Sequence, residues 1–385
     1  TVLIEMGEVA NIPQLRFPEF SNEWEESKVG KVFKVSAGGD IKTENVSQIK
    51  TDGFPYPIYA NAEKAKGLYG YSNLYKSEAN VVTVAGRGVN IGIAHVRLEP
   101  FYPIVRLLVL NPIKDADVKF WENQLNQLNL FVESTGVPQL TAPQISSYKV
   151  KYPSKPEQQK IAAFLTAVDN KIEQLSKKQE LLGEYKKGLM QQIFSQAIRF
   201  KADDGSDFPD WEEKKLGDVS DCLDNRRQPL NGAERNQMKG DIPYYGANGI
   251  VDYVNDYIFD EELVLLAEDG GNFNDFSSKP IAQKISGKAW VNNHAHILKA
   301  KNIIATDFLF YSLVHKDIRR YIVGGSRAKL NKSDLLSIKT ILPPLEEQAK
   351  IASFLSSIDN KIEQVGKQLV ESKQFKKALL QQMFV

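Results

Sequence analysis

The sequence holds a single cysteine, Cys222, among its 385 residues. One cysteine cannot form a disulfide within the chain, and it cannot build a cysteine-rich zinc module. Chains that lack a disulfide framework fit a reducing compartment. We therefore expect a cytoplasmic protein that is held together by its hydrophobic cores rather than by covalent cross-links.

Long apolar runs are also missing. The most apolar stretch, residues 102–113, is interrupted by Arg106 and is too short to span a bilayer. Residues 1–10 contain two glutamates and no basic segment, so we expect no secretory signal there. The sequence thus predicts a protein without a membrane partner.

Charge of one sign is not in excess, because 49 Lys and Arg stand against 48 Asp and Glu. A strongly basic balance would have indicated nucleic-acid binding directly, and a net charge of +1 gives no such indication. The composition is that of a folded protein, with 42% hydrophobic residues. The length exceeds what one hydrophobic core usually supports, so we expect two or three domains.

The chain is an internal repeat whose period is half its length. Residues 158–174 and 348–364 are identical at 12 of 17 positions, including the run D-N-K-I-E-Q that ends each copy. The match resumes at residues 189–194 and 379–384. Self-similarity at a fixed period indicates a duplicated architecture.

Each half reads as a globular segment followed by a helix. A Trp-Glu-Glu triplet lies near the start of both globular segments, at Trp24 and Trp211. Between these shared features the two segments differ almost completely in sequence. Short β-type runs alternate in them with Gly, Asn and Pro and with helical stretches, which predicts a mixed α/β (α+β) fold. We expect strands at residues 81–85, 104–110, 263–267 and 296–298, and helices at 118–133 and 306–323.

The repeated segments carry apolar residues spaced alternately by four and three positions, which is a heptad seam. Pro156 and Pro344, with Glu157, Glu346 and Glu347 in the first turns, indicate where the two helices begin. Because the helices are near-copies, we expect them to pack on each other as a coiled-coil spacer. The alternative is that each helix docks on its own globular segment or mediates self-association. The seam consists of Ile161, Leu165, Val168, Ile172 and Leu175 in the first helix and of Ile351, Leu355, Ile358, Ile362 and Val365 in the second.

The sequence contains partial matches to catalytic motifs, and each of them lacks residues that the motif requires. The glycines around Arg87 lack the spacing of a dinucleotide-binding fingerprint. The carboxylates at residues 212–213 are too close in sequence to gather a metal from separate strands. His294 and His296 share one face of an expected strand, but no third ligand is near, so we interpret them as a packing or hydrogen-bonding pair. A binding protein without a catalytic or metal site is favoured over an enzyme.

The repeated motifs resemble one known family. Both copies of P-x-x-x-E-Q-x-K-I-A-x-F-L with the following D-N-K-I-E are similar to the conserved regions of the specificity subunit of type I restriction–modification systems. The Q-L-R-F-P-E-F segment at residues 14–20 and the tripeptide at 247–249 also resemble members of that family, as does the tetrapeptide at 291–294. The resemblance covers essentially the whole chain.

The resemblance implies an architecture. Two target recognition domains would be separated by two long antiparallel coiled-coil helices, with a pseudo-two-fold relationship between the halves. The expected bounds are residues 1–153 for the first recognition domain, 154–199 for the central helix, 200–342 for the second domain and 343–385 for the C-terminal helix.

The resemblance also implies a function and its partners. Each domain would read one half of a bipartite, asymmetric double-stranded DNA target. The chain would have no catalysis and no cofactor of its own. Two modification (adenine-methyltransferase) subunits and the restriction subunits would be its protein partners, and these would carry S-adenosylmethionine, ATP and magnesium. The rival interpretations are a stand-alone, type II-like nuclease or methyltransferase component and a coiled-coil scaffold without DNA specificity.

Candidate DNA-contacting residues come from elementary chemistry and not from the resemblance. Arginine suits guanine and asparagine suits adenine in the major groove, and a glycine-rich turn permits close backbone approach to a phosphate. In the first globular segment the candidates are Asn61, Lys64, Lys66, Arg87, Asn90, Gln139 and Thr141. In the second they are Arg226, Arg227, Asn248, Asn272, Asn274, Asn293, Arg327 and Lys329.

Overall fold

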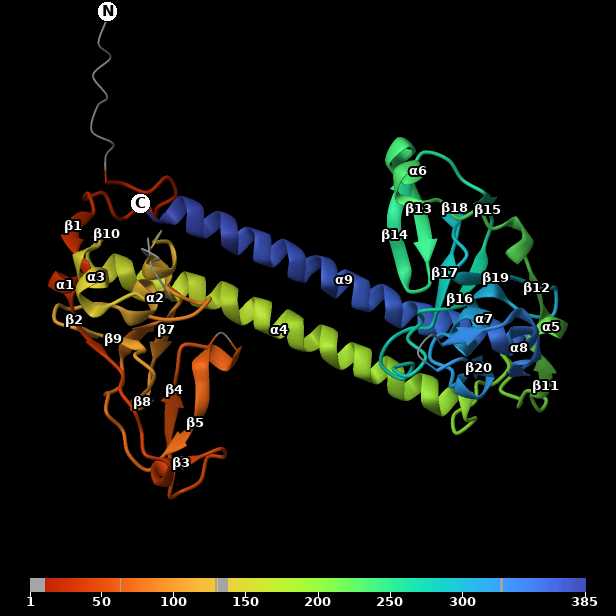
Figure 1. Cartoon of the computed structure of the whole chain (residues 1–385), viewed down its shortest axis with the longest axis horizontal. Helices are drawn as coiled ribbons and strands as arrows, with labels where there is room; N and C mark the ends of the chain where they lie inside the picture. Colours follow the sequence, from red (N-terminus) through yellow and green to blue (C-terminus); the bar gives the residue numbers. More distant parts are fainter. Residues whose placement is uncertain (1–10, 63, 129, 131–137, 326–327) are drawn as a thin grey trace, which may run out of the picture. The chain divides into compact units, whose positions relative to one another are not determined.

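The computed structural model describes residues 11–62, 64–128, 130, 138–325 and 328–385. The chain forms two compact units (Figure 1). Unit 1 combines Thr1–Lys177 with Gly366–Val385, and unit 2 is the continuous stretch Lys178–Val365. The helices α4 (Lys155–Phe194) and α9 (Leu345–Met383) each contribute one part to each unit. The domain bounds expected from the sequence, which treat each helix as a separate segment, stay a prediction.

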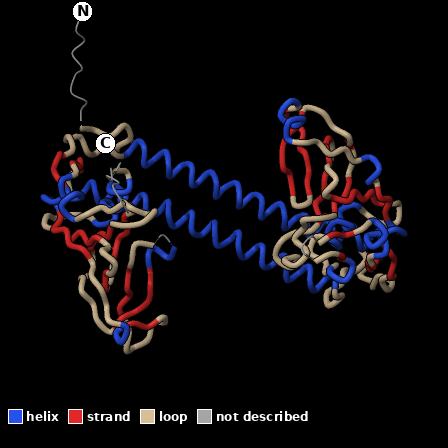
Figure 2. Tube along the Cα trace, viewed as in Figure 1, coloured by secondary structure: helices blue, strands red, loops and turns tan. Residues whose placement is uncertain are grey.

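Apart from these long helices, unit 1 is built from short strands and short helices (Figure 2). Its strands are β1 (Glu25–Lys28), β2 (Phe33–Ala37), β3 (Val46–Ser47), β4 (Tyr56–Tyr59), β5 (Leu68–Ser72), β6 (Val81–Val84), β7 (Ala94–Arg97), β8 (Tyr102–Pro103), β9 (Leu108–Pro112) and β10 (Lys149–Tyr152). Its helices are α1 (Val29–Val32), α2 (Val118–Asn126) and α3 (Ala142–Ser147), with 3-10 turns η1 (Thr43–Asn45) and η2 (Lys64–Gly67).

Unit 2 repeats this plan with longer strands in places. Its strands are β11 (Glu212–Lys215), β12 (Ser220–Cys222), β13 (Lys239–Gly246), β14 (Gly249–Val254), β15 (Phe259–Asp260), β16 (Leu263–Ala267), β17 (Ala282–Ile285), β18 (Lys288–Val291), β19 (Ala295–Ala300), β20 (Ile322–Val323), β21 (Lys329–Leu330) and β22 (Lys339–Leu342). Its helices are α5 (Leu216–Val219), α6 (Gly232–Gln237), α7 (Thr306–Leu313) and α8 (Lys332–Ser337), with 3-10 turns η3 (Asp224–Arg226) and η4 (Arg319–Tyr321).

The first sheet and the entry ribbon of the two units correspond strand by strand, whereas the second sheets share three strands and differ in the fourth, which is β3 beside β5 in unit 1 and β15 beside β18 in unit 2. An antiparallel sheet of order β2-β9-β6-β7 in unit 1 matches β12-β19-β16-β17 in unit 2. A second sheet, β3-β5-β4-β8 or β14-β13-β18-β15, contains the parallel pair β4–β8 or β13–β18. A two-stranded ribbon, β1–β10 or β11–β22, closes each head where the chain enters and leaves it. The repeat that the sequence shows in the helices therefore extends to the heads, whose sequences have diverged.

Both long helices take part in the core of each unit. In unit 1, Ile161 and Leu165 of α4 share a buried cluster with Leu379 and Met383 of α9, together with head residues such as Trp121. The start of α4 thus lies beside the end of α9, so the two helices run antiparallel in unit 1. Phe384 extends this packing, with its ring stacked on that of Phe120 at 5.4 Å.

The core of unit 2 is built in the same way from the other ends of the helices. Met190 and Ile193 of α4 share a cluster with Ile351 and Leu355 of α9 and with Phe308 of the head. The expectation that the helices pack on each other is confirmed, and each of them also packs on a head at both of its ends. Seven of the ten predicted seam residues are buried, whereas Val168, Ile172 and Ile362 are half-buried.

Three expected elements were too long. The helix expected at 306–323 ends at Leu313, and the chain then forms η4 and β20. The helix expected from residue 118 ends at Asn126, and part of the remainder lies outside the described residues. The strand expected at 104–110 begins only at Leu108, because Val105 and Arg106 adopt the left-handed backbone conformation, with φ of 51° and 58°.

Among the described residues, no helix is both long and apolar enough to cross a membrane.

Candidate nucleic-acid interface

In unit 1 a polar pair lies in the loop that follows the central strand β6. The Arg87 Nη2 donates a hydrogen bond to Gln139 Oε1 at 3.0 Å, and the backbones of these two residues form an isolated β-bridge. Leu140 N donates to the Gly86 carbonyl at 2.8 Å, which fixes the two segments side by side. Arg87 has no carboxylate partner among the described residues. Arg87 is half-buried, and within the described part of the chain its only side-chain hydrogen bond is the one to Gln139.

The side chain of Asn61 holds this loop in place. Its Nδ2 donates to the carbonyl of Val105 at 2.6 Å, and its Oδ1 accepts from Gly86 N at 2.9 Å. Both polar ends of the amide are thus engaged within the chain, and they tie the loop to the left-handed turn before β9. The structure therefore gives Asn61 a positioning role beside Arg87.

The other candidates of unit 1 are spread more widely. Lys66 has a left-handed backbone, with φ of 53°, and its carbonyl accepts from the buried Arg97 at 2.8 Å; Lys64 lies in the same turn. Asn90 is half-buried in the loop that contains Arg87. Thr141 caps α3 through a capping box with Gln144, so its hydroxyl is used locally.

The corresponding place in unit 2 carries different chemistry. After β16, Asp269 forms the β-bridge with Lys329, and Leu330 N donates to the Glu268 carbonyl at 2.7 Å, as Leu140 does to Gly86. The Lys329 Nζ lies 3.0 Å from a carboxylate oxygen of Glu268. An arginine and a glutamine therefore stand in one head where an aspartate and a lysine stand in the other.

A buried network of charges lies beneath this second loop. Arg227 forms ion pairs with Glu268 and with Asp224, and it donates to the Ala295 carbonyl at 3.0 Å. The His296 Nδ1 contacts Asp224 Oδ2 at 2.6 Å, and its Nε2 donates to the Leu330 carbonyl at 2.8 Å. Partners that only accept at both ring nitrogens require the doubly protonated, cationic imidazole.

The pKa of His296 agrees with this assignment. Burial by itself lowers the pKa, but hydrogen bonds with Asp224 and Cys222 and the charge of Asp224 outweigh burial and raise it to about 9. Cys222, Asp224 and His296 place their ligand atoms within 4.8 Å of one another, a grouping that can also hold a metal ion. Since both nitrogens of His296 have partners within the chain, we interpret the group as a structural ion-pair network.

The remaining candidates of unit 2 differ in how free their side chains are. Arg226 is paired with Glu261 at 2.8 Å, and its guanidinium lies over the Phe259 ring. Two asparagine amides are used within the chain, because Asn248 donates to the Gly270 carbonyl and Asn272 to the Pro280 carbonyl. Asn274 and Asn293 are exposed, and Arg327 lies outside the described residues. Contact of any candidate with DNA stays a prediction.

Sequence reasoning missed the residues that join each head to its helix. Glu157, at 1% exposure, accepts two hydrogen bonds of 2.7 Å from Arg16. Glu347, at 0% exposure, accepts from Arg199 at 3.2 and 2.8 Å and from Trp211 Nε1 at 2.9 Å. These buried, bidentate pairs connect the segment before each head with the helix after it. The Arg-Phe dipeptide that occurs in both halves, at residues 16–17 and 199–200, is the sequence feature that could have indicated these ion pairs.

The glutamine that follows each of these glutamates has an equally specific place. Gln158 donates to the Pro153 carbonyl at 2.9 Å and accepts from Asp117 N at 3.0 Å. Gln348 makes the equivalent bonds to Pro343 and Ala305, both at 2.8 Å. The repeated Glu-Gln dipeptide therefore fixes the start of each long helix against its head.

Two heads of similar topology, with different polar groups at the same place, are typical of a duplicated recognition protein. Residues 21–182 and 209–372 both match the family described as "Type I restriction modification DNA specificity domain". The chain belongs to this family, and it is a specificity subunit of the type I restriction–modification kind. Such subunits recognise DNA and are the non-catalytic part of a restriction enzyme complex.

Individual relatives agree with the family match. A type I restriction enzyme specificity subunit of Methanocaldococcus jannaschii is 28% identical over 313 residues, 72% of this chain and 71% of that protein. A Haemophilus influenzae protein that carries the name of such a subunit is 37% identical over 148 residues, only 38% of this chain and 37% of that protein.

The fold itself is known. The S subunit of a type I restriction–modification system from M. genitalium has a TM-score of 0.68 at 18% identity, covering 97% of this chain and 99% of that one. A chain from a structure that concerns complex assembly of the type I restriction–modification system has a TM-score of 0.50 at 15% identity, with 93% and 96% covered.

Proposed function

We propose that the two heads read the two halves of a bipartite, asymmetric DNA target and that the chain positions modification subunits, which methylate adenine, on that target. Restriction subunits would join the same complex. The partner subunits would bind S-adenosylmethionine, ATP and magnesium. The two long helices would set the spacing between the half-sites. This chain would contribute recognition and no chemistry.

The observation that carries the proposal is the polar pair after β6 and β16. Arg87 and Gln139 present mainly N–H donors, which suit the O6 and N7 acceptors of guanine in the major groove. At the equivalent place stand Asp269, whose carboxylate contacts His294 Nδ1 at 2.5 Å, and Lys329, which pairs with Glu268. A homodimer would offer the same groups twice and read a palindrome. Two different pairs on one fold favour an asymmetric target.

Arg87 is the most informative residue for a test of base recognition. Arg226, Arg227 and Lys329 are held by carboxylates, whereas Arg87 contacts a neutral glutamine. A bidentate arginine–guanine contact is worth about 1–3 kcal/mol of discrimination. Arg87→Ala should therefore relax the specificity at one position of one half-site and leave the other half-site unchanged. Methylation mapping of cellular DNA, with the cognate modification subunits co-expressed, measures both halves at once.

Arg87→Lys is the matched variant, because it keeps the charge and loses the planar fork. If Arg87 reads a base, the lysine variant should relax the same position as the alanine variant. If Arg87 only contacts phosphate, the modification subunits should still methylate the original sequence when they are combined with the lysine variant. An unchanged target in both variants would remove Arg87 from the interface.

The rival interpretations predict other outcomes. A stand-alone nuclease or methyltransferase would modify DNA without partners when supplied with magnesium or S-adenosylmethionine. A scaffold without DNA specificity would give no sequence-dependent protection even with modification subunits present. Either result would overturn the proposal.

A further inference from the structure

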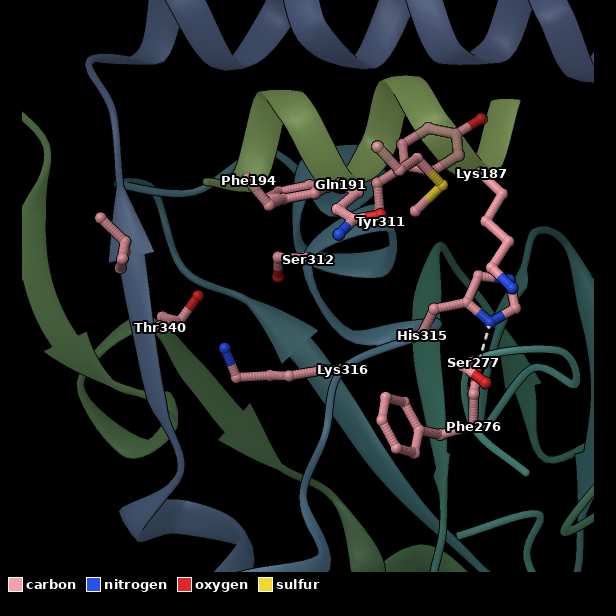
Figure 3. A pocket seen from close by; sticks show the side chains of 12 residues that line it. Lys187, Gln191, Phe194, Phe276, Ser277, Tyr311, Ser312, His315, Lys316 and Thr340 are labelled. Atoms are coloured by element: carbon pink, nitrogen blue, oxygen red, sulfur yellow. Dashed lines mark hydrogen bonds between the residues drawn. The ribbon is translucent and has the colours of Figure 1, made fainter. Parts of the chain in front are cut away.

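Unit 2 contains a cavity of about 390 Å³ beside the end of α4. It opens to solvent and is lined by the last turns of that helix, by α7 and the residues after it, by the segment at 276–277 and by β22 (Figure 3). Much of its wall is apolar, from the side chains of Met190, Phe194 and Phe276. Cavities of this size, mainly apolar with a few placed polar groups, are typical of small-molecule sites.

One wall of the cavity holds a buried hydroxyl without a partner. Thr340 is 1% exposed, and its Oγ1 makes no hydrogen bond to any residue that the structure describes. Leaving such a group unsatisfied costs about 1–3 kcal/mol, so an unpartnered buried hydroxyl needs an explanation.

The internal repeat shows that the fold does not require this hydroxyl. Thr340 lies opposite Lys214 in the ribbon β11–β22, and the equivalent place in ribbon β1–β10, opposite Ser27, is Val150. Val150 is buried at 2% exposure. An apolar side chain of the same shape therefore fills this position in unit 1, and the polar one in unit 2 is available for a ligand.

A cation shares the cavity with Thr340. Lys316 has no acidic partner among the described residues, and burial, followed by the nearby charge of Arg320, lowers its pKa. Figure 3 shows the Lys316 amine and the Thr340 hydroxyl directed into the same part of the cavity. His315 lies on a further wall, where its Nδ1 donates to the Phe276 carbonyl at 2.7 Å. An amine and a hydroxyl, neither of them paired with a side chain in the described part of the chain, therefore face the same part of a largely apolar cavity.

We propose that this cavity binds a small organic monocarboxylate with an apolar body. One carboxylate oxygen would accept from Lys316 Nζ and the other from Thr340 Oγ1, while the apolar body would lie against Phe194 and Phe276. Lys316 balances one negative charge, since the other lysine of the lining, Lys187, is exposed to solvent, and the two donors Lys316 and Thr340 match two oxygens. A neutral apolar ligand would leave both donors unsatisfied, and a dianionic phosphate would find too few donors. The proposal does not depend on DNA recognition by either head.

The experiment compares two probes that differ only in charge. The full chain is titrated with 4-phenylbutyrate and, separately, with its neutral amide, and binding is followed by calorimetry and by ligand-observed NMR. We expect the carboxylate to bind at least tenfold more tightly than the amide. Equal affinity for both probes, or no binding of either at millimolar concentration, would overturn the proposal.

Two variants assign the effect to this cavity. Lys316→Met keeps the apolar stem and removes the charge, so the carboxylate should lose its advantage over the amide. Thr340→Val reproduces the residue found in unit 1, so it should fold, and it should weaken carboxylate binding severalfold. Circular dichroism checks that both variants are folded. Wild-type affinity in a folded Lys316→Met variant would place the probe elsewhere on the chain and refute the site.

Discussion

The Lys186 ammonium of α4 donates a hydrogen bond to the Asp359 carboxylate of α9 at 2.6 Å. The residues 190 positions away, Lys376 and Asp169, form the same interhelical pair at 2.6 Å. Asp169 and Asp359 are the aspartates of the repeated D-N-K-I-E-Q run. One duplicated sequence therefore supplies both partners of two equivalent contacts, which is what antiparallel packing of two copies requires.

Reversing one of these pairs tests whether it specifies the packing. We choose Asp169–Lys376, because Asp359 also accepts a hydrogen bond from Tyr311. Asp169→Lys and Lys376→Glu should each lower the free energy of unfolding, and the double variant should recover most of the loss. The coupling free energy should be about 0.5 kcal/mol, as for partly exposed pairs. Urea denaturation of the four proteins measures it, and a coupling of zero would make the pair incidental.

The buried pair Arg199–Glu347 should matter far more. Glu347→Leu leaves the partly exposed Arg199 with only Asp210, at 3.8 Å, and leaves the buried Trp211 Nε1 without its acceptor, so it should destabilise unit 2 by about 1–3 kcal/mol. Glu346→Leu is the matched control, because Glu346 is exposed on the same turn. Hydrogen exchange with mass spectrometry resolves the two units. Similar protection of unit 2 in the two variants would contradict the role assigned to Glu347.

The seam between the long helices can be broken at a well-buried position. Val365, at 4% exposure, is more deeply buried than Ile172, so a charge placed there should disrupt the seam more strongly. Val365→Asp places a charge in the seam and should cost about 3 kcal/mol or more. Val370→Asp is the control on the same helix, at 54% exposure. We expect Val365→Asp to lose co-purification with modification subunits before the heads unfold, whereas Val370→Asp retains it.

The stability of unit 2 should fall at alkaline pH. His296 has a folded-state pKa of about 9 against 6.5 for an ordinary histidine. Its stabilising contribution is thus fully present below pH 6.5 and is lost as the pH rises through 9, with a total of about 3 kcal/mol. His296→Gln should be less stable at pH 6 and should show a flatter profile between pH 6.5 and 9. Equal slopes in the variant and the wild type would assign the pH dependence to other groups.

The long helices were predictable because their signal is local and repeated. The heptad spacing, the proline near each start (Pro156 is the second residue of α4 and Pro344 precedes α9) and the near-identity of the two copies all indicate the same element. The heads were predictable only as a mixture of strands and helices. Nothing local in the run at 306–323 marks Leu313 as the end of α7, since the residues beyond it remain apolar enough to continue a helix.

The candidate interface was predictable in part. Arg87 and Gln139 were chosen separately, 52 positions apart, and the structure brings them into contact. Arg227 was chosen as a DNA reader, but its carboxylate partners come from distant parts of the chain and no local pattern indicates them. No local sequence pattern indicates the ion pairs that join each head to its helix, because the partners are distant in the sequence: Arg16 and Glu157 lie 141 positions apart.

The construction of unit 1 sets an order for folding during synthesis. Leu379, Met383 and Phe384, which the ribosome adds only after all of unit 2, pack in the core of unit 1, whose head is made before unit 2. Unit 2, in contrast, is complete once Val365 has been made. Although domains usually fold in the order in which they are translated, here the earliest head must wait for the final turns of α9. A nascent chain that stops short of those turns would carry a finished second head and an open first one.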